Sequence, residues 1–351
     1  MDIRSGDEHC VRRALELASH GPAVDANPRV GCVLAVHGEI VGEGWHRGAG
    51  TPHAEAAALT AAGERAAGAT AYVTLEPCSH TGRTGPCANA LIDAGVVRVV
   101  FAQSDPNPVA GGGGHVLREA GIDVAGGLLE HEATVLNKHW TFAVTHTRPF
   151  VTWKFAATLD GRSAAADGTS RWITGEQARA DVHRLRAAAG AVLAGTGTVL
   201  VDDPQLTVRV TPDPEADGAP SAPLRVIVGH RDVPPSARVS DDSAPTIQIR
   251  SNDPAEVLAQ LHQREIRHAF LEGGPTLAAA FLKAGLVDEI LAYLAPALLG
   301  AGPTAVGDLD IATIADLARF DLQDVTRLGD DVRLRLRLPS QQNDTASTKE
   351  T

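Results

Sequence analysis

Pro52-His53-Ala54-Glu55 begins a stretch that continues with Glu76-Pro77-Cys78 and ends at Pro86-Cys87. One imidazole and two thiolates can hold a zinc ion, and three protein ligands leave the fourth zinc position free for water, as catalytic zinc sites do. We therefore predict that His53, Cys78 and Cys87 bind zinc. Glu55 opens an alanine-rich segment close to His53, where its carboxylate can move protons without joining the metal.

The order of these residues is typical of one class of zinc enzyme. In zinc nucleobase deaminases, H-x-E is followed by P-C-x-x-C, zinc activates water, and the glutamate acts as general acid and base. Here the second cysteine comes nine positions after the first, and a glycine-rich loop separates Cys78 from Cys87. Cys87 opens an apolar-periodic segment, so it can bind metal from a helix N-terminus, where a thiolate is favoured.

With these residues the chain resembles a known family, the bifunctional deaminase–reductase of riboflavin biosynthesis. The long cysteine spacing is specific to this branch of the deaminases, and the resemblance covers nearly all of residues 7 to 338. The matching segments of the first half are Asn27-Pro28-Arg29-Val30-Gly31, Gly44-Trp45-His46, His53-Ala54-Glu55, Thr74 to His80, Pro86-Cys87 and Asp105-Pro106-Asn107-Pro108. The resemblance implies that Asn27 lies in the pyrimidine pocket, although an Asn-Pro pair is also an ordinary turn.

Composition limits the classes of partner. The chain has 351 residues and 44% hydrophobic content, enough for two domains with their own cores. Its net charge of −12 argues against a protein that neutralises many nucleic-acid phosphates, so we expect a small-molecule substrate and no nucleic acid. No apolar run is long enough to span a membrane, and the N-terminus lacks the apolar core of a signal peptide. We therefore expect no membrane partner and a cytoplasmic location.

Four cysteines in a chain of this length do not make a disulfide framework. Cys78 and Cys87 are the predicted metal ligands. Cys10 falls in a helical pattern and Cys32 in an apolar strand, so both are predicted to be buried thiols without chemistry.

The first half alternates strand and helix patterns. An apolar stripe follows Asp7, which can cap a helix, and Val30 to Val36 and Ile40 to Trp45 flank a short hairpin connection. The later alternation predicts a three-layer α/β domain whose sheet is largely parallel in its second half. Glu76-Pro77-Cys78 would then lie at the carboxyl end of a strand, where ligands bind. Residues 111 to 114, all glycine, are predicted to form a flexible loop without chemistry.

The second half begins where helical spacing over residues 128 to 147 gives way to Arg148-Pro149 and an apolar strand. Within it, Leu271-Glu272-Gly273-Gly274-Pro275-Thr276 joins a strand to a helix. Paired glycines before a helix let the backbone approach an anion, and the first N–H groups favour a phosphate. On physics alone an ordinary turn is an equal interpretation. The resemblance continues here into the family's reductase domain, which has a dihydrofolate-reductase-like fold, and it favours NADPH.

The resemblance implies ligand contacts for residues of the second half. Cofactor contacts are implied for Ala156, Trp172, Thr198, Asp202, Gly274, Pro275, Thr276, Leu277, Ala278, Ala279 and Ala280. Substrate contacts are implied for Ser170, Arg186, Leu206, Arg209 and Glu272. Arg186 and Arg209 have an independent rationale, because guanidinium groups match phosphate geometry. Lys154 and Asp202 are candidates for polar assistance to the reduction, and a core lysine or loop aspartate without chemistry is an equally fair interpretation.

The predicted architecture is an α/β/α zinc domain of the cytidine-deaminase type at residues 1–147, a dihydrofolate-reductase-like α/β domain at 148–339 and a disordered polar tail at 340–351. The resemblance implies a bifunctional enzyme of riboflavin biosynthesis. It would deaminate 2,5-diamino-6-(5-phosphoribosylamino)pyrimidin-4-one with Zn²⁺, and then reduce the ribosyl side chain to ribityl with NADPH. A homo-oligomer is expected from the resemblance alone.

Three alternatives remain open. The acidic charge disfavours a tRNA deaminase and the long cysteine spacing disfavours both tRNA and nucleoside deaminases; turnover of cytidine or adenosine would support this alternative. A chain in which only one half works would show no NADPH binding by residues 148 to 340. A purely structural zinc protein would show no change in turnover when Glu55 becomes glutamine.

Overall fold

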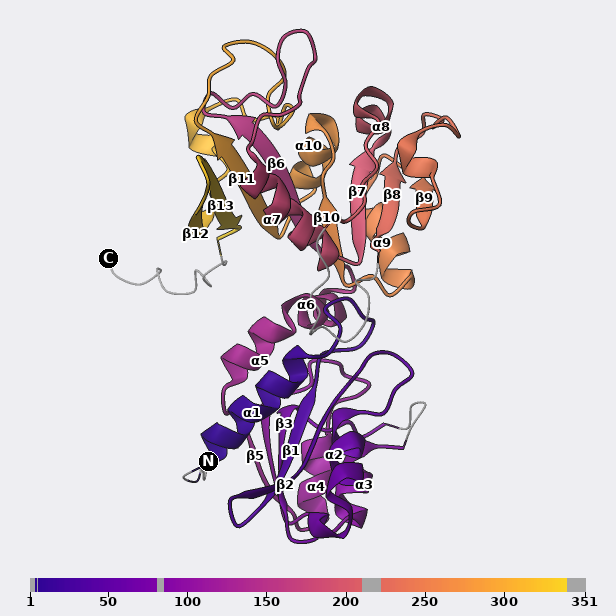
Figure 1. Ribbon diagram of the computed structural model, residues 1–351, viewed down its shortest axis with the longest axis vertical. Coiled ribbons are helices and arrows are strands. Elements are labelled where there is room, and N and C mark those ends of the chain that lie inside the picture. The colour runs from indigo at the N-terminus through magenta and orange to yellow at the C-terminus, as the bar shows by residue number, and fades with distance from the viewer. Residues whose placement is uncertain (1–3, 5, 81–84, 210–221, 340–351) are drawn as a thin grey trace, which may run out of the picture. The chain divides into compact units, whose positions relative to one another are not determined.

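The computed structural model describes residues 4, 6–80, 85–209 and 222–339, so the predicted tail at 340–351 lies outside the described residues. The chain forms two compact units, whose main division falls between Pro149 and Phe150 (Figure 1). Each unit is built around one sheet. Among the described residues, no helix has both the length and the apolar character needed to cross a membrane.

The first unit has a five-stranded sheet in the order β2-β1-β3-β4-β5. Its strands are β1 (Gly31–Val36), β2 (Glu39–Trp45), β3 (Thr70–Leu75), β4 (Arg98–Gln103) and β5 (Asp123–Gly126). Its helices are α1 (Asp7–Ser19), α2 (Ala54–Ala62), η1 (Gly63–Ala66), α3 (Cys87–Asp93), α4 (Gly113–Glu119), α5 (Glu130–Leu136) and α6 (Lys138–His146). Strand β1 is antiparallel to β2 and β3, whereas β3, β4 and β5 are parallel, which confirms the predicted sheet.

Two hydrophobic clusters on opposite faces of this sheet make the three layers. Helices α2, α3 and α4 cover one face, and α1 and α5 cover the other (Figure 1). Cys32 and Leu34 of β1 belong to the first cluster, and the alternate residues Val33 and Ala35 belong to the second. Cys10 of α1 is buried in the second cluster. Cys10 and Cys32 are therefore buried free thiols, as predicted.

Glycine in β2 brings helix α2 unusually close to the sheet. A Cβ atom at Gly42 would lie 2.5 Å from the carbonyl oxygen of Ala58, and one at Gly44 would lie 2.5 Å from the Ala58 nitrogen. Any larger side chain would push the helix away, because such approaches are shorter than van der Waals contact. Since α2 carries Glu55 in its first turn, this packing fixes the depth of that carboxylate.

Asp7 does not cap the first helix as the sequence suggested. Gly6 is the capping residue, and Asp7 is the first residue of α1 with its side chain buried. Its carboxylate accepts two hydrogen bonds of 2.8 Å from Arg98 and one of 3.0 Å from the Tyr72 hydroxyl. The role of Asp7 therefore depends on Arg98, which is far away in the sequence. Reasoning from local patterns cannot include such a partner.

Two further expectations of the first half are corrected. The glycines at 111–114 do not form a simple loop, because α4 begins at Gly113. The helical spacing over 128–147 is divided into α5 and α6 at Asn137. The buried side chain of Asn137 accepts a hydrogen bond from the backbone nitrogen of Arg29 and donates one to its carbonyl oxygen, both of 2.8 Å, so this break secures the segment that follows Asn27.

The second unit has an eight-stranded sheet in the order β12-β13-β11-β6-β10-β7-β8-β9. Its strands are β6 (Phe150–Thr158), β7 (Ala191–Gly195), β8 (Leu224–Val228), β9 (Thr246–Ile249), β10 (His268–Leu271), β11 (Glu289–Ala295), β12 (Asp321–Leu328) and β13 (Asp331–Arg337). Its helices are α7 (Glu176–Ala187), α8 (Thr196–Asp202), η2 (Arg238–Ser240), α9 (Pro254–Gln263), α10 (Pro275–Lys283) and η3 (Ile314–Asp316). The six strands from β11 to β9 are mutually parallel, and only the β13 and β12 edge is antiparallel.

The α/β architecture predicted for the second half is confirmed. Because the six central strands are parallel, their carboxyl ends meet at one edge of the sheet, where α/β proteins bind ligands. The segments at this edge include the Gly273-Gly274 turn after β10 and the start of α8 after β7.

Candidate active sites

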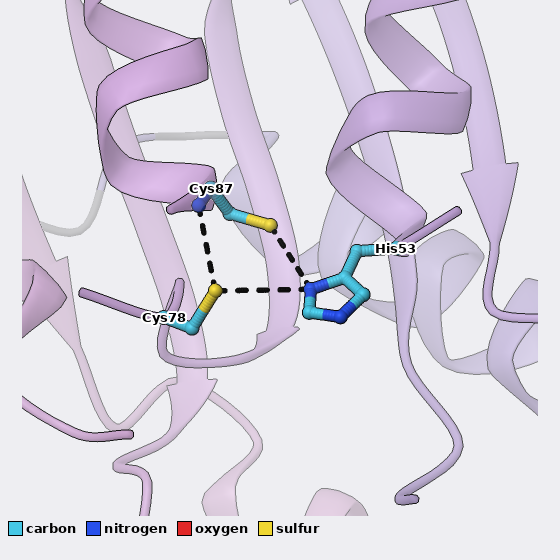
Figure 2. A group of neighbouring side chains, drawn as sticks. All are labelled: His53, Cys78 and Cys87. Atoms are coloured by element: carbon cyan, nitrogen blue, oxygen red, sulfur yellow. Dashed lines mark hydrogen bonds between the residues drawn. The ribbon is translucent and has the colours of Figure 1, made fainter. Parts of the chain in front are cut away.

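Three side chains of the first unit converge from three separate segments of the chain (Figure 2). His53 immediately precedes α2, Cys78 follows β3, and Cys87 is the first residue of α3. The Nδ1 atom of His53 lies 3.2 Å from Sγ of Cys87 and 3.7 Å from Sγ of Cys78. The three candidate ligand atoms lie within 4.8 Å of one another.

These distances fit a single zinc ion. Tetrahedral zinc with bonds of about 2.1 Å to nitrogen and about 2.3 Å to sulfur separates neighbouring ligand atoms by roughly 3.6–3.8 Å. The cluster needs only small adjustments to reach that geometry. His53 presents Nδ1 to the two sulfurs, and the backbone N–H of Cys87 donates to Sγ of Cys78 over 3.4 Å, which orients that thiolate as an outer-shell hydrogen bond does.

The cysteine pair is electrostatically prepared for metal binding. A hydrogen bond from the Cys87 thiol, followed by one from His53, lowers the pKa of Cys78 to about 4 despite its burial. The pKa of Cys87 is raised, because the neighbouring Cys78 thiolate and burial both favour its protonated form. The pair therefore holds one thiolate, and a divalent cation would stabilise the second.

Glu55 lies beside this cluster with only 4% of its surface exposed. Burial raises its pKa, against smaller opposing effects from its own backbone N–H and from His53. A buried carboxyl group with a raised pKa holds a proton more readily than an exposed one, which suits a general acid/base. The structure thus places the predicted general acid/base next to the three predicted ligands.

The segment carrying Cys78 is held by residues that sequence reasoning missed. The Glu76 carboxylate accepts hydrogen bonds from the backbone nitrogens of Gly114 (2.9 Å) and Asp105 (3.2 Å). A Cβ atom at Gly113 would lie 1.7 Å from the Pro77 carbonyl oxygen, so only glycine permits α4 to approach the residue before Cys78. The sequence shows both the glycine run and the Glu-Pro-Cys motif. It does not show that they contact each other, because they are far apart along the chain.

Asn27 is linked to the metal cluster through His46. The Asn27 amide nitrogen lies 3.2 Å from Nε2 of His46, whose Nδ1 lies 3.1 Å from the carbonyl oxygen of Pro52. The buried His46 ring meets the His53 ring edge to face, with centroids 5.8 Å apart. Asn27 itself is exposed, so its side chain is available to a ligand.

In the second unit, Arg186 and Glu272 form an ion pair whose side chains are only 13% and 8% exposed. Nη2 of Arg186 donates to Glu272 over 2.8 Å, and Nη1 donates to the Thr207 carbonyl oxygen over 2.9 Å. Lys154 of β6 lies near this pair; burial lowers its pKa, with Glu272 opposing the effect. The pKa of Glu272 is lowered because Arg186 outweighs the effect of burial.

His183 adds a contact that the sequence did not reveal. The backbone N–H of Arg209 donates to Nδ1 of His183 over 3.3 Å. His183 lies one turn before Arg186 on α7, so both hold the segment 207–209. Leu206, by contrast, packs its side chain into the core with 4% exposed, so any contact it makes with a substrate involves its backbone.

Two of the segments predicted to bind the cofactor are joined by a hydrogen bond. The Gly274 N–H donates to the Thr198 hydroxyl over 2.9 Å, which joins the glycine turn to α8. Ala156 lies on β6. Ala278 and Ala279 are buried in α10, whereas Gly274, Pro275, Thr276 and Ala280 are at least partly exposed.

A pocket of about 230 Å³ lies where β6 and β11 end. Its lining residues are Thr158, Ala165, Thr169, Ser170, Arg171, Trp172, Ile173, Ala297 and Leu299. Ser170 donates to the Asp202 carboxylate over 3.4 Å, and Trp172 is 68% exposed with the Arg179 guanidinium 4.6 Å from its ring. The structure therefore brings a predicted substrate residue, Ser170, and a predicted cofactor residue, Trp172, to one pocket.

Comparison with known proteins identifies both halves. The family model described as "Cytidine and deoxycytidylate deaminase zinc-binding region" matches residues 4–103. The model described as "RibD C-terminal domain" matches residues 149–334. These two matches correspond to the two structural units.

Several known proteins match this chain over nearly their whole length. The riboflavin biosynthesis protein RibD of Mycobacterium tuberculosis is 51% identical over 88% of this chain and 90% of its own length. The structure of RibD from Acinetobacter baumannii superimposes with a TM-score of 0.86 at 41% identity, covering 95% of this chain and 98% of that one. A Thermotoga maritima structure, described as a diaminohydroxyphosphoribosylaminopyrimidine deaminase/5-amino-6-(5-phosphoribosylamino)uracil reductase, gives a TM-score of 0.81 at 33% identity over 95% and 99% of the two chains. The chain therefore belongs to the RibD family of riboflavin biosynthesis proteins.

Proposed function

We propose that this chain catalyses two consecutive reactions on one small molecule. The first unit deaminates 2,5-diamino-6-(5-phosphoribosylamino)pyrimidin-4-one to 5-amino-6-(5-phosphoribosylamino)uracil and ammonia. The second unit reduces the ribosyl side chain of that product to ribityl with NADPH. The observation that carries the proposal is the convergence of His53, Cys78 and Cys87 beside the buried Glu55, in a chain whose other half matches the RibD C-terminal domain.

For the deamination, His53, Cys78 and Cys87 would hold Zn²⁺, whose Lewis acidity makes water nucleophilic at neutral pH. Glu55 accepts a proton from the attacking water and delivers it to the departing amino group. A carbon–oxygen bond forms at the amino-bearing ring carbon, the carbon–nitrogen bond breaks, and ammonia leaves. Asn27 supplies an amide to hold the pyrimidine ring in place, with His46 fixing its position.

For the reduction, the turn that begins α10 and the start of α8 would bind the cofactor, which donates a hydride to the ring-opened ribosyl carbon. Arg186, Arg209 and Glu272 would bind the substrate. Lys154 is placed near Glu272 with a lowered pKa, so its ammonium group can supply the proton that completes the reduction. Asp202 orients Ser170 through their hydrogen bond.

The proposal assigns residues 1–147 to the deaminase domain and 148–339 to the reductase domain. It also includes a cytoplasmic location, which four free cysteines in a metal-binding chain favour. We further propose a homo-oligomer formed through β12. This edge strand is almost wholly exposed and presents Leu322 and Val325, each more than half exposed, and such an edge is a ready surface for pairing with a second chain.

Product analysis by mass spectrometry tests this function. Zinc-loaded protein with the diaminopyrimidine phosphate should exchange one amino group for oxygen without NADPH, and should add two hydrogens only when NADPH is present. Cytidine and adenosine serve as comparison substrates and should remain unchanged. If either nucleoside is deaminated while the pyrimidine phosphate is not, the proposed substrate is wrong.

A further inference from the structure

The cofactor proposed for the second unit has to lie along one edge of its sheet. Strands β6, β10, β7 and β8 are consecutive neighbours and mutually parallel. Their carboxyl ends therefore form a row, in which the Gly273-Gly274 turn follows β10 and the start of α8 follows β7. The glycine turn is the place for the pyrophosphate, because α10 begins there at Pro275 and the backbone N–H groups of Thr276 and Leu277 have no acceptor within the helix.

The pocket fixes which end of the cofactor lies on which side. It lies at the ends of β6 and β11 and contains Ser170 and Trp172. The hydride-donating ring has to lie beside the substrate, so the nicotinamide belongs on this side of β10. The adenosine half must then extend the other way, across the ends of β7 and β8.

Arg231 lies where that half would end. It comes three residues after β8, and its Nη2 atom is 2.8 Å from the position that a Cβ atom would occupy at Gly197. Its guanidinium group thus lies over Gly197, next to Thr198 in the first turn of α8. Any side chain at 197 would displace it, so the glycine makes room for the cation.

Arg231 is exposed, and in the described part of the chain no ion pair includes it. The neighbouring Arg250 differs, because it pairs with Asp232 at 2.5 Å and donates to the His230 carbonyl oxygen over 2.7 Å. The charge of Arg250 is therefore compensated, whereas that of Arg231 remains available for an anion.

We propose that Arg231 binds the 2′-phosphate of NADPH and thereby makes the enzyme prefer NADPH to NADH. Neighbouring strands are about 4.8 Å apart, so the end of β8 lies roughly 10 Å from the end of β10. An adenosine ribose with a 2′-phosphate, together with an extended arginine side chain, spans that separation. The phosphate carries close to two negative charges at neutral pH, and a planar guanidinium can bind it with two hydrogen bonds. The inference rests on the proposed function, from which it takes the cofactor and its pyrophosphate site.

Calorimetric titration of the full-length protein with NADP⁺ and NAD⁺ tests this assignment without any turnover. Arg231→Ala should weaken NADP⁺ binding about 10- to 100-fold, the range for losing a hydrogen-bonded charged partner, and should leave NAD⁺ binding unchanged. Arg231→Lys should recover part of the loss, because it keeps the charge without the planar fork. Arg250→Ala is the matched control and should leave the NADP⁺/NAD⁺ ratio at the wild-type value. Titration with 2′-AMP and 5′-AMP should show the same selectivity for the 2′-phosphate.

The outcomes separate the two levels of the proposal. Equal weakening of NADP⁺ and NAD⁺ by Arg231→Ala, or no change in either, overturns the role of Arg231 while the reductase function stands. Wild-type protein that binds neither nucleotide overturns the reductase function and the assignment of Arg231 with it. A thermal unfolding midpoint at the wild-type value verifies that the second unit of each variant, which carries Arg231 and Arg250, is folded.

Discussion

Replacing Gly113 with alanine should damage the metal centre without touching any of its ligands. A Cβ atom there would lie 1.7 Å from the carbonyl oxygen of Pro77, whereas real Cβ atoms do not approach other atoms closer than 3.0 Å. The helix α4 and the Pro77-Cys78 backbone must therefore separate by about 1.3 Å. Zinc ligands tolerate displacements of only about 0.2 Å, so Cys78 is expected to move out of range.

The expected loss is about 10- to 100-fold in zinc affinity, as for other perturbations that reorient a ligand. Deamination should fall about 100-fold at limiting zinc, because a misplacement near 1 Å costs that much. Zinc affinity is measured by chelator competition and deamination by ammonia release. Gly85→Ala is the matched control, since a Cβ atom at residue 85 would meet nothing within 4 Å.

The reductase half-reaction provides an internal reference for this variant. It should proceed at the wild-type rate when the deaminated intermediate is supplied. The reasoning would be refuted if Gly113→Ala kept zinc affinity and ammonia release within about threefold of wild type, a change well below the loss expected for a misplaced ligand. The contact with Pro77 would then have no consequence for Cys78.

Three other predictions concern charge and metal. Burial, followed by the charges of Arg186 and Arg209, lowers the pKa of His183, while Glu272 opposes them. The neutral Nδ1 of His183 accepts a hydrogen bond from the Arg209 backbone, so the reductase KM for substrate should rise below about pH 6.5, where the ring becomes protonated. His183→Asn keeps an acceptor and should abolish that pH dependence. Asp7→Asn should lower the free energy of unfolding, measured by thermal denaturation, by about 3–5 kcal/mol, because Arg98 loses a buried partner. Glu8→Gln removes an exposed partner of Arg12 and serves as the comparison; an equal loss of stability there would show that burial does not matter. Chelation of zinc should lower the Tm of the first unit and stop ammonia release, with recovery on adding zinc and not magnesium.

His183 and Asp7 both make the protein less stable as the pH falls, although for different physical reasons. The folded-state pKa of His183 lies below its usual value, so its contribution is complete above about pH 6.5 and is lost as the pH falls. The pKa of Asp7 is also lowered, because hydrogen bonds from Arg98, Arg4 and Tyr72 outweigh burial. Its contribution is present above about pH 4 and is lost in more acidic solution.

Local patterns predicted the elements and the chemistry of the first unit well. His53-Ala54-Glu55 and the two Pro-Cys pairs are short motifs, and their geometry depends on a strand end and two helix starts whose positions periodicity indicates. The structure brings His53, Cys78 and Cys87 together as expected. The parallel order of β3, β4 and β5 also followed from the alternation of strand and helix patterns.

Contacts between distant segments were beyond sequence reasoning. Asp7 seemed a helix cap because its partner Arg98 is 91 residues away, and Gly113 seemed part of a loop because Pro77 comes from another element. Asn137 interrupts a continuous helical pattern, and its side chain bonds to the backbone of Arg29, which is distant in the sequence. In each case a tertiary hydrogen bond or a close packing contact overrode the local preference. Such contacts cannot be recognised in a single sequence.

The most direct test of the two-site account follows ammonia release and NADPH oxidation separately in wild-type protein and in Glu55→Gln. Glutamine preserves the size of the buried side chain but cannot accept and return a proton. We expect the variant to lose ammonia release by at least about 100-fold, and to oxidise NADPH at the wild-type rate when it receives the deaminated intermediate. Undiminished ammonia release by the variant with zinc bound would contradict the account, because Glu55 would then have no part in the chemistry.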